Sequence, residues 1–511
     1  MVDVSAPIAP PATTRSFRPA WLVLGLVLVV SYLMVVAIFA DRKLLWTDEI
    51  FTVSIAQQPT LGRFFDELLH GPDSLPPLTH LATRVSISML GPTHIAFRLP
   101  AAVGFLIALV CIYQFLRVRA SVAVSYVGVL ALCSANAFPY AYEARPYGLL
   151  MGFCALSLLC CQRAAISRRW YWYGGLSIGI LGAISSHWYG VMVLVPILAG
   201  EIARLAIHRR VDWRMALAIT IALIPTPLLR PFAAQAMTFR GVVPPPSDLS
   251  DYLKQVYEFA NGPVLVCLCL AYLVAVYVRR TGRDDAKSWS VHELVLVGAT
   301  SALPIAGFVV AQLTGGQSLP RYLMTTAVGV ALLVGVVTQL LDAQTKLFGR
   351  IALAATIGAA GTNVLAAKLN LQERSWVGEG KGVYWLLKAT NDQQRLDDLP
   401  IVVENVHDYL PLVHYAKSPL KEKLMYLTGP DVMAGQGLLN MMSFMPLNVQ
   451  RRDDFIREHN DFYLYEGPER TPLLAQFLAH GATIVESGIN DSRDIYPRPG
   501  YLFRVVMKTR N

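Results

Sequence analysis

Long apolar runs alternate with short charged segments from residue 20 to residue 367. Many of these runs approach or exceed about 18 residues, the length that a helix needs to cross the hydrocarbon core of a bilayer. Their repetition predicts a polytopic α-helical membrane protein with about eleven transmembrane helices. The predicted spans are residues 20–40, 97–116, 122–138, 148–161, 170–185, 191–207, 215–229, 263–278, 294–313, 323–341 and 351–367.

The segment after the first span, residues 41–96, follows a different pattern. Residues 48–57 and 61–70 are amphipathic, and residues 78–90, which follow a Pro-Pro pair, are apolar on one face. These pieces are too short and too polar to cross a membrane. We therefore expect helices that lie in the plane of the membrane interface.

From about Leu369 the composition becomes that of an ordinary soluble domain. Short β-rich runs alternate there with helical stretches, which predicts a small α/β domain. The expected strands are residues 400–403, 423–427, 461–465, 482–486 and 501–507, and the expected helices are residues 383–389, 409–417, 453–459 and 472–480. The domain organisation predicted from composition is a disordered tail (1–19), a transmembrane domain (20–368) and an exported α/β domain (369–511).

Basic residues gather in every second loop between the predicted spans. This asymmetry places the N-terminus in the cytoplasm, and an odd number of spans then places the C-terminal domain outside the inner (cytoplasmic) membrane. The net charge of +9 is explained by this orientation, so we expect no nucleic-acid partner. Isolated charged or titratable residues fall on the other, extracytoplasmic side: Asp48, Glu49, Glu143, Arg145, His187, Glu258 and Arg321.

Two adjacent carboxylates, Asp48 and Glu49, follow the first span. Acidic residues often begin a helix, because the helix dipole favours negative charge there. The alternative is a general base at the membrane surface, and the two interpretations are compatible. We favour catalysis, with Asp48 as the base and Glu49 as the less certain member.

Two further motifs fall on the same predicted side. One is the segment Glu143-Ala-Arg145-Pro-Tyr147, and the other is the pair Arg321-Tyr322. Taken alone, Glu143 and Arg145 could form a structural salt bridge, and Arg321 could anchor a helix at the interface. Together with a carboxylate, the arginines suit a substrate that carries a hydroxyl and a phosphate.

With these motifs the chain resembles the GT-C glycosyltransferases, in the branch of the protein O-mannosyltransferases and the lipid A aminoarabinose transferase. The resemblance extends over residues 44–341. Its motifs are Trp46-Thr47-Asp48-Glu49, Pro76-Pro77-Leu78 with Phe97-Arg98-Leu99-Pro100, the Glu143 to Tyr147 segment, and Arg321-Tyr322.

This resemblance implies an inverting transfer of a sugar from a polyprenyl-phosphate donor to a hydroxyl of a lipid, polysaccharide or protein acceptor. Asp48 would act as the base, while Arg145 and Arg321, with Tyr147 and Tyr322, would hold the donor phosphate. Further residues that could contact substrate or a divalent metal ion are Glu143, His187, Glu258 and Asp73.

One departure concerns the residues before Pro76. The family often has His or Glu-Lys there, whereas this chain has Ser74-Leu75, with Asp73 slightly earlier. A lipid or solute transporter is the competing interpretation. Transporters place ionisable residues near the bilayer midplane, whereas the predicted spans here have few charges at their centres.

Overall fold

The computed structural model describes residues 19–71, 73–238, 246–259, 289–315, 319–345, 348–372, 398–428, 442, 445, 447–466, 473–489 and 501–507. Its contacts divide the chain into two compact units. The first comprises residues 1–41 and 75–365, and the second comprises residues 42–74 and 366–511.

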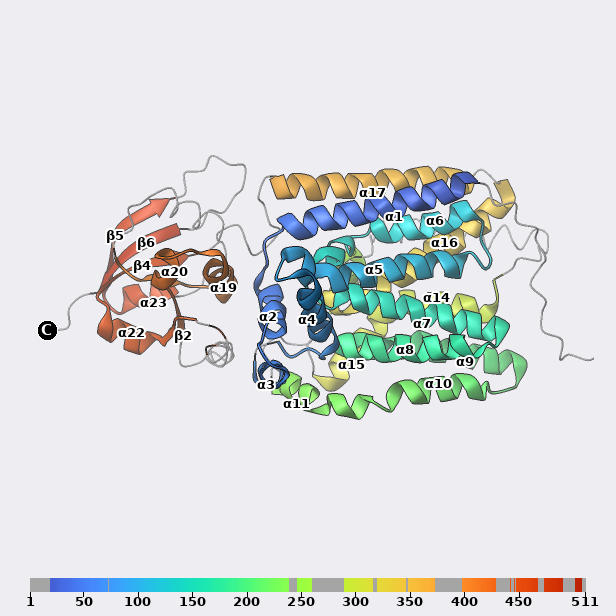
Figure 1. Ribbon diagram of the computed structural model, residues 1–511, viewed down its shortest axis with the longest axis horizontal. Coiled ribbons are helices and arrows are strands. Elements are labelled where there is room, and N and C mark those ends of the chain that lie inside the picture. The colour runs from blue at the N-terminus through green and yellow to red at the C-terminus, as the bar shows by residue number, and fades with distance from the viewer. Residues whose placement is uncertain are drawn as a thin grey trace, which may run out of the picture. The chain divides into compact units, whose positions relative to one another are not determined.

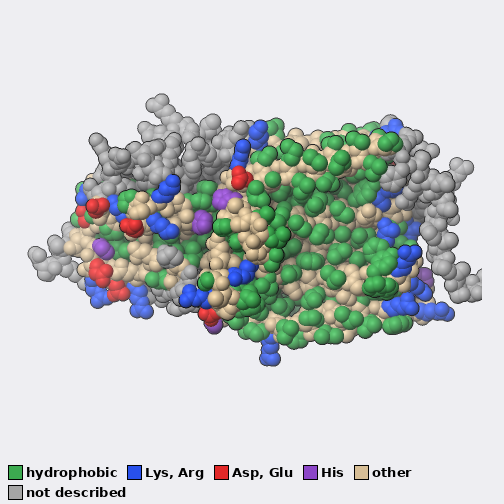
Figure 2. Space-filling view, in the orientation of Figure 1, with side chains coloured by type: hydrophobic (Ala, Val, Ile, Leu, Met, Phe, Trp, Pro, Cys, Tyr) green, Lys and Arg blue, Asp and Glu red, His purple; other side chains and the backbone are tan. Residues whose placement is uncertain are grey.

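The first unit, called the helical unit here, consists of long helices that lie side by side (Figure 1). Figure 2 shows that the visible face of these helices is almost entirely hydrophobic, with Lys and Arg gathered at one end. Its elements are α1 (Pro19–Arg42), α4 (Leu78–Leu90), α5 (His94–Leu116), α6 (Val122–Cys133), η1 (Phe138–Tyr142), α7 (Tyr147–Ser167), α8 (Trp170–Ser186), η2 (Trp188–Val193), α9 (Leu194–His208), α10 (Trp213–Leu223), η3 (Thr226–Leu229), α11 (Arg230–Thr238), α12 (Leu249–Phe259), α14 (Val291–Ser301), α15 (Leu303–Thr314), η4 (Pro320–Leu323), α16 (Thr325–Thr345) and α17 (Phe348–Gln372).

The predicted spans that fall on described residues all form helices. Within the described residues, seven helical stretches are long and apolar enough to cross a membrane, which makes the chain a multi-pass membrane protein. An eighth span results if α14 and α15, bent by 54° at Ala302, are counted together. Two other predicted spans are shorter helices, α6 with 12 residues and α8 with 17. The span predicted at 263–278 lies outside the described residues, so the total of eleven stays a prediction.

The bend between α14 and α15 interrupts a run that the sequence analysis treats as one helix. Pro304 lies in the first turn of α15, where it lacks the N–H that a continuous helix would need. A proline in a long apolar run commonly produces such a break.

Helices α5 and α7 approach each other at glycines. A Cβ added to Gly148 would lie 2.3 Å from the carbonyl oxygen of Ala101, and one added to Gly104 would lie 2.5 Å from the backbone of Leu149. Small residues allow helix backbones to approach closely within a membrane. This contact fixes the start of α7, which begins at Tyr147, the last residue of the segment 143–147.

A buried carboxylate joins several helices at their basic end. Glu293, in the first turn of α14, is completely buried and accepts hydrogen bonds from Arg119 Nε at 3.1 and 3.2 Å. Gln162 Nε2 donates to it at 2.8 Å, and the Ser290 hydroxyl donates at 2.8 Å. The sequence analysis did not single out this cluster.

The second unit combines an α/β domain with the segment 42–74. Its sheet has the order β3-β2-β1-β4-β6-β5, in which β3, β2, β1 and β4 are parallel and β6 is antiparallel to both neighbours. The elements are α2 (Thr47–Ala56), α3 (Leu61–His70), β1 (Ile401–Val403), α19 (Val406–Tyr415), α20 (Leu420–Lys423), β2 (Leu424–Thr428), β3 (Val449–Arg451), α22 (Arg452–Glu458), β4 (Asp461–Glu466), α23 (Leu473–Ala479), β5 (Ala482–Ile489) and β6 (Tyr501–Met507). Strands occur at all five predicted positions, β3 and α20 were missed, and the helix predicted at 383–389 lies outside the described residues.

The core of the sheet is aromatic on one face. Phe455, Phe462 and Phe477 are buried there and pack ring against ring, with centroid distances of 5.0 Å. On helix α19, the buried Tyr409 hydroxyl donates to the Asn448 carbonyl at 2.8 Å and accepts from the Asn448 N–H at 2.9 Å. This pair of hydrogen bonds ties α19 to the residue that precedes β3.

Helix α2 packs against α19 within the second unit. The Tyr415 hydroxyl accepts a hydrogen bond from the Leu45 N–H at 2.7 Å, and the Thr47 hydroxyl donates to the His407 carbonyl at 3.4 Å. The first part of the predicted external loop therefore groups with the C-terminal residues, whereas α4 groups with the helices. The three amphipathic pieces are helices as predicted, and their interfacial position stays a prediction.

Candidate functional site

Asp48 and Glu49 begin α2 but have different surroundings. The Glu49 carboxylate is completely buried and accepts a hydrogen bond from the Trp46 N–H at 3.4 Å, so it serves the first turn of the helix. Asp48 is only partly buried, and its backbone carbonyl accepts from the Thr52 hydroxyl at 3.2 Å. The helix-cap role thus belongs to Glu49, and the Asp48 side chain is the more accessible of the two.

The segment after α2 contributes two more buried carboxylates to the second unit. Asp73 accepts a hydrogen bond from the Thr52 hydroxyl at 3.3 Å, and Glu67 accepts from the Ser54 hydroxyl at 2.7 Å. These contacts hold α3 and residue 73 against α2. Asp73 therefore has a structural contact on the same helix that carries Asp48.

In the helical unit, rings from distant segments form a cluster, called the aromatic cluster here. The ring of His187 lies 5.6 Å from that of Tyr147 and 4.8 Å from that of Tyr322, measured between centroids. Tyr140 lies 4.9 Å from Tyr147, and Tyr189 lies 5.4 Å from Tyr322. The cluster joins η1, the start of α7, His187 with the η2 that follows it, and η4. It thereby unites two of the predicted motifs, with His187 between them.

His187 is 2% exposed, and one of its ring nitrogens has a defined role. The Tyr189 N–H donates to Nδ1 at 3.1 Å, so the proton of the neutral ring lies on Nε2. A metal ion bound at Nε2 would require loss of that proton as well. The arrangement favours His187 as a hydrogen-bond donor through Nε2 over His187 as a metal ligand.

The two predicted phosphate-binding arginines flank the aromatic cluster in sequence. Arg145 is 7% exposed and lies two residues before Tyr147, while Arg321 is partly exposed and immediately precedes Tyr322. Glu143, 8% exposed, precedes them on the same loop. Burial and the neighbouring Glu143 raise the pKa of Tyr142, an effect that Arg98 partly offsets, so this hydroxyl stays neutral.

Glu258 lies at the end of α12, with its side chain exposed. Its backbone carbonyl accepts from the Asn136 side chain at 2.8 Å, and the Phe259 carbonyl accepts from the Ala137 N–H at 3.0 Å. Phe259 also lies 6.1 Å from Tyr140. The end of α12 is thus bound to the segment that leads into the aromatic cluster.

Two further features bear on the predicted roles. Arg98 is completely buried and donates to the Ala40 carbonyl at 2.6 Å, which satisfies a carbonyl near the end of α1 and supports a structural role. Among the residues that the structure describes, no group of three or more His, Cys, Asp or Glu side chains could hold a metal ion.

Sequence reasoning named the three central members of the aromatic cluster, Tyr147, His187 and Tyr322, but missed the outer two, Tyr140 and Tyr189. The signal was present, because Tyr140 belongs to the same loop as Tyr147, and Tyr189 follows His187 by two residues. Aromatic residues at span ends are common in any membrane protein, however, and this weakened the signal.

Comparison with known proteins shows a partial match to one family model and a shared fold. Residues 74–230 match the family model described as dolichyl-phosphate-mannose-protein mannosyltransferase. A sequence search of curated proteins found no significant match.

Two solved structures resemble the whole chain. ArnT from Cupriavidus metallidurans bound to undecaprenyl phosphate aligns with a TM-score of 0.59 at 15% identity, covering 95% of this chain and 98% of that one. The apo state of the same protein aligns with a TM-score of 0.60 at 14% identity and the same coverage.

The chain therefore has the fold of the GT-C glycosyltransferases, a class of polytopic membrane proteins, and the predicted resemblance to that class is confirmed. Within the class it resembles the protein O-mannosyltransferases over residues 74–230 and ArnT over nearly its full length.

Proposed function

We propose that this protein is an inverting glycosyltransferase that moves a sugar from a polyprenyl-phosphate donor to an acceptor hydroxyl. The observation that carries the proposal is the aromatic cluster, in which a buried histidine joins Tyr147 to Tyr322, two residues that neighbour Arg145 and Arg321 in sequence. The GT-C fold and the undecaprenyl phosphate bound to ArnT support this choice of donor.

The donor phosphate is assigned to the helical unit. Arg145 and Arg321 neutralise the phosphate and can each donate two hydrogen bonds to its oxygens. The hydroxyls of Tyr147 and Tyr322 and the Nε2–H of His187 are neutral donors of hydrogen bonds from the same cluster. Together they stabilise the charge that grows on the phosphate as it leaves.

The base is assigned to Asp48. Its carboxylate takes the proton of the acceptor hydroxyl, and the oxygen attacks the anomeric carbon from the side opposite the phosphate. The bond from that carbon to the phosphate oxygen breaks, and its electron pair stays on the released polyprenyl phosphate. Because a phosphate monoester is a good leaving group, charge stabilisation matters more here than protonation. Glu49 positions Asp48 by holding the first turn of α2.

The remaining assignments follow the sequence analysis. The reaction takes place on the extracytoplasmic side of the inner membrane, with the N-terminus in the cytoplasm and the α/β domain outside. The acceptor is a cell-envelope glycolipid, a polysaccharide or a protein. Glu143, Glu258 and Asp73 are secondary candidates for contacts with the sugar, the acceptor or a divalent metal ion.

The test is turnover of the purified full-length protein with a polyprenyl-phosphate sugar and an envelope extract as the acceptor source, with released polyprenyl phosphate as the readout. Loss of a general base lowers rates by about 10²- to 10⁴-fold, so Asp48→Asn should lose turnover by that factor at an unchanged melting temperature. The exposed Asp66, on α3, provides the control Asp66→Asn.

Two outcomes would overturn the proposal. Full turnover in Asp48→Asn would remove the assigned base. Donor binding without release of polyprenyl phosphate from any extract, combined with movement of the lipid between leaflets, would favour a transporter.

A further inference from the structure

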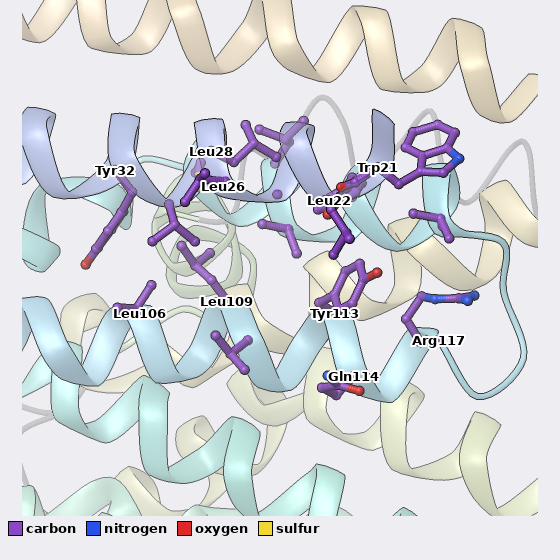
Figure 3. Close-up of a pocket in the computed structure, with 18 of the residues that line it drawn as sticks. Trp21, Leu22, Leu26, Leu28, Tyr32, Leu106, Leu109, Tyr113, Gln114 and Arg117 are labelled. Carbon is purple, nitrogen blue, oxygen red and sulfur yellow. Dashed lines mark hydrogen bonds between the residues drawn. The ribbon is translucent and has the colours of Figure 1, made fainter. Parts of the chain in front are cut away.

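A cavity of about 700 Å³ lies within the helical unit, away from the aromatic cluster. Side chains of α1, α5 and α6 line it, and Figure 3 shows apolar side chains of α1 and α5 that face each other across it. Its volume falls within the range of about 300–1,000 Å³ that is typical of small-molecule sites. The described residues that line it include no Asp and no Glu.

Two hydrogen bonds hold α1 against its neighbours, one near each end of the part of α1 that lines the cavity. At one point the Tyr126 hydroxyl donates to the Trp21 carbonyl at 3.0 Å, and the two rings stack 6.3 Å apart. At the other, the Tyr32 hydroxyl donates to the Ala102 carbonyl at 2.7 Å. The buried residues of α1 begin only at Tyr32.

An apolar gap of this size inside a bilayer would leave its walls without packing partners. Within the hydrocarbon core of a bilayer water is scarce, so lipid acyl chains are the molecules available to fill such a gap. The lining is apolar along most of the length of the cavity, which suits an acyl chain that runs parallel to α1.

One end of the cavity differs in charge. Arg117 and Gln114 lie at the end beside Trp21, and Arg163 from α7 also lines the cavity (Figure 3). Arg163 donates to the Gln114 carbonyl at 3.0 Å, which places its guanidinium at the same end. Both arginines are partly exposed. They lie at the ends of their helices, where the sequence analysis places basic clusters.

We propose that this cavity is a binding site for an anionic phospholipid, distinct from the donor site. Its phosphate contacts Arg117 and Arg163, and its acyl chain lies between α1 and α5. The positive charge at one end favours an anionic lipid over a zwitterionic one, because a zwitterionic headgroup would gain less binding energy from two guanidinium groups. The lipid fills the space between α1 and α5.

The test is native mass spectrometry of the full-length protein, titrated separately with palmitoyl-oleoyl phosphatidylglycerol, with the matching phosphatidylcholine and with undecaprenyl phosphate. Phosphatidylglycerol should bind at least tenfold more tightly than phosphatidylcholine. The double variant Arg117→Gln/Arg163→Gln should lose that preference, and Arg210→Gln, which removes an exposed arginine outside the cavity, should keep it.

A second pair of variants tests the cavity itself. Val110→Trp places a large side chain at a cavity-lining position and should weaken phosphatidylglycerol binding about tenfold. Ile202→Trp, on an exposed face of α9, should not. Equal binding of the two phospholipids would overturn the proposal. So would a loss of undecaprenyl phosphate binding in Val110→Trp, because the cavity would then belong to the tail of the donor.

Discussion

His187 offers the sharpest test of the proposed donor site. Its Nδ1 accepts from the Tyr189 N–H at 3.1 Å, so the neutral ring carries its proton on Nε2, the group that we assign to the donor phosphate. The variant His187→Phe keeps a ring of similar size among Tyr147 and Tyr322 but removes both nitrogens. His187→Gln keeps an amide that can donate.

The size of the effect follows from the hydrogen bond that is lost. A hydrogen bond to a charged group contributes about 1.5–3 kcal/mol, and about 1.4 kcal/mol corresponds to a tenfold change in affinity. The dissociation constant for undecaprenyl phosphate should therefore rise about 10- to 150-fold in His187→Phe and less in His187→Gln. The Tyr189 N–H also loses its acceptor in the Phe variant, which should cost about 1–3 kcal/mol of stability.

The assay is direct binding of undecaprenyl phosphate to the purified protein, with thermal unfolding measured in parallel. His208→Phe, at an exposed position at the end of α9, is the control. Wild-type affinity in His187→Phe would refute the reasoning. Binding that disappears on chelation and returns with a divalent cation would also refute it, because His187 would then act through a metal.

Three structural contacts lead to further predictions. Gly148→Ala should lower the melting temperature, because the added Cβ would lie 2.3 Å from a backbone carbonyl oxygen and overpacking costs about 1–3 kcal/mol. The control Gly174→Ala should leave the melting temperature unchanged, because there is open space around Gly174. Arg119→Ala should destabilise the helical unit by about 3 kcal/mol in thermal unfolding, because it leaves a buried carboxylate without its ion partner. Tyr409→Phe should cost about 1–3 kcal/mol by loss of two hydrogen bonds, more than Tyr426→Phe, whose hydroxyl bonds to none of the described residues. Burial raises the pKa of the Tyr409 hydroxyl above its ordinary value of about 10. The stability that this hydroxyl contributes is therefore fully present below about pH 10 and is lost as the pH rises further. Alkaline unfolding monitored by circular dichroism would detect this loss.

The helices of the membrane part were predictable because lipid leaves the backbone few choices. An apolar run in a bilayer must satisfy its own N–H and C=O groups, so a run such as 97–116 forms a helix wherever it packs. The bend at Ala302 was harder to predict, since Pro304 gave the only local signal within an otherwise uniform run. Strand β3 was missed because it has only three residues, one of which is the charged Arg451. It is a strand because it pairs with β2, and that pairing leaves no local pattern in the sequence.

The candidate site was only partly predictable. Asp48, Arg145 and Arg321 follow from motifs that stand out against apolar surroundings. The position of His187 between Tyr147 and Tyr322 depends on how three loops pack, and no local pattern carries that information. The different surroundings of Asp48 and Glu49 were likewise invisible in the sequence, because adjacent residues on a helix face different neighbours.

The buried Glu293 has a consequence for the way this protein is made. Its partner Arg119 precedes it by 174 residues, which takes a ribosome about 9–35 s to synthesise. Arg119 and Gln162 are thus made well before Glu293, and a buried carboxylate without its partners is costly. The carboxylate of Glu293 therefore gains these partners only when α14 docks against Arg119 and Gln162. We therefore expect the docking of α14, which completes this ion pair, to be a late step in the assembly of the bundle.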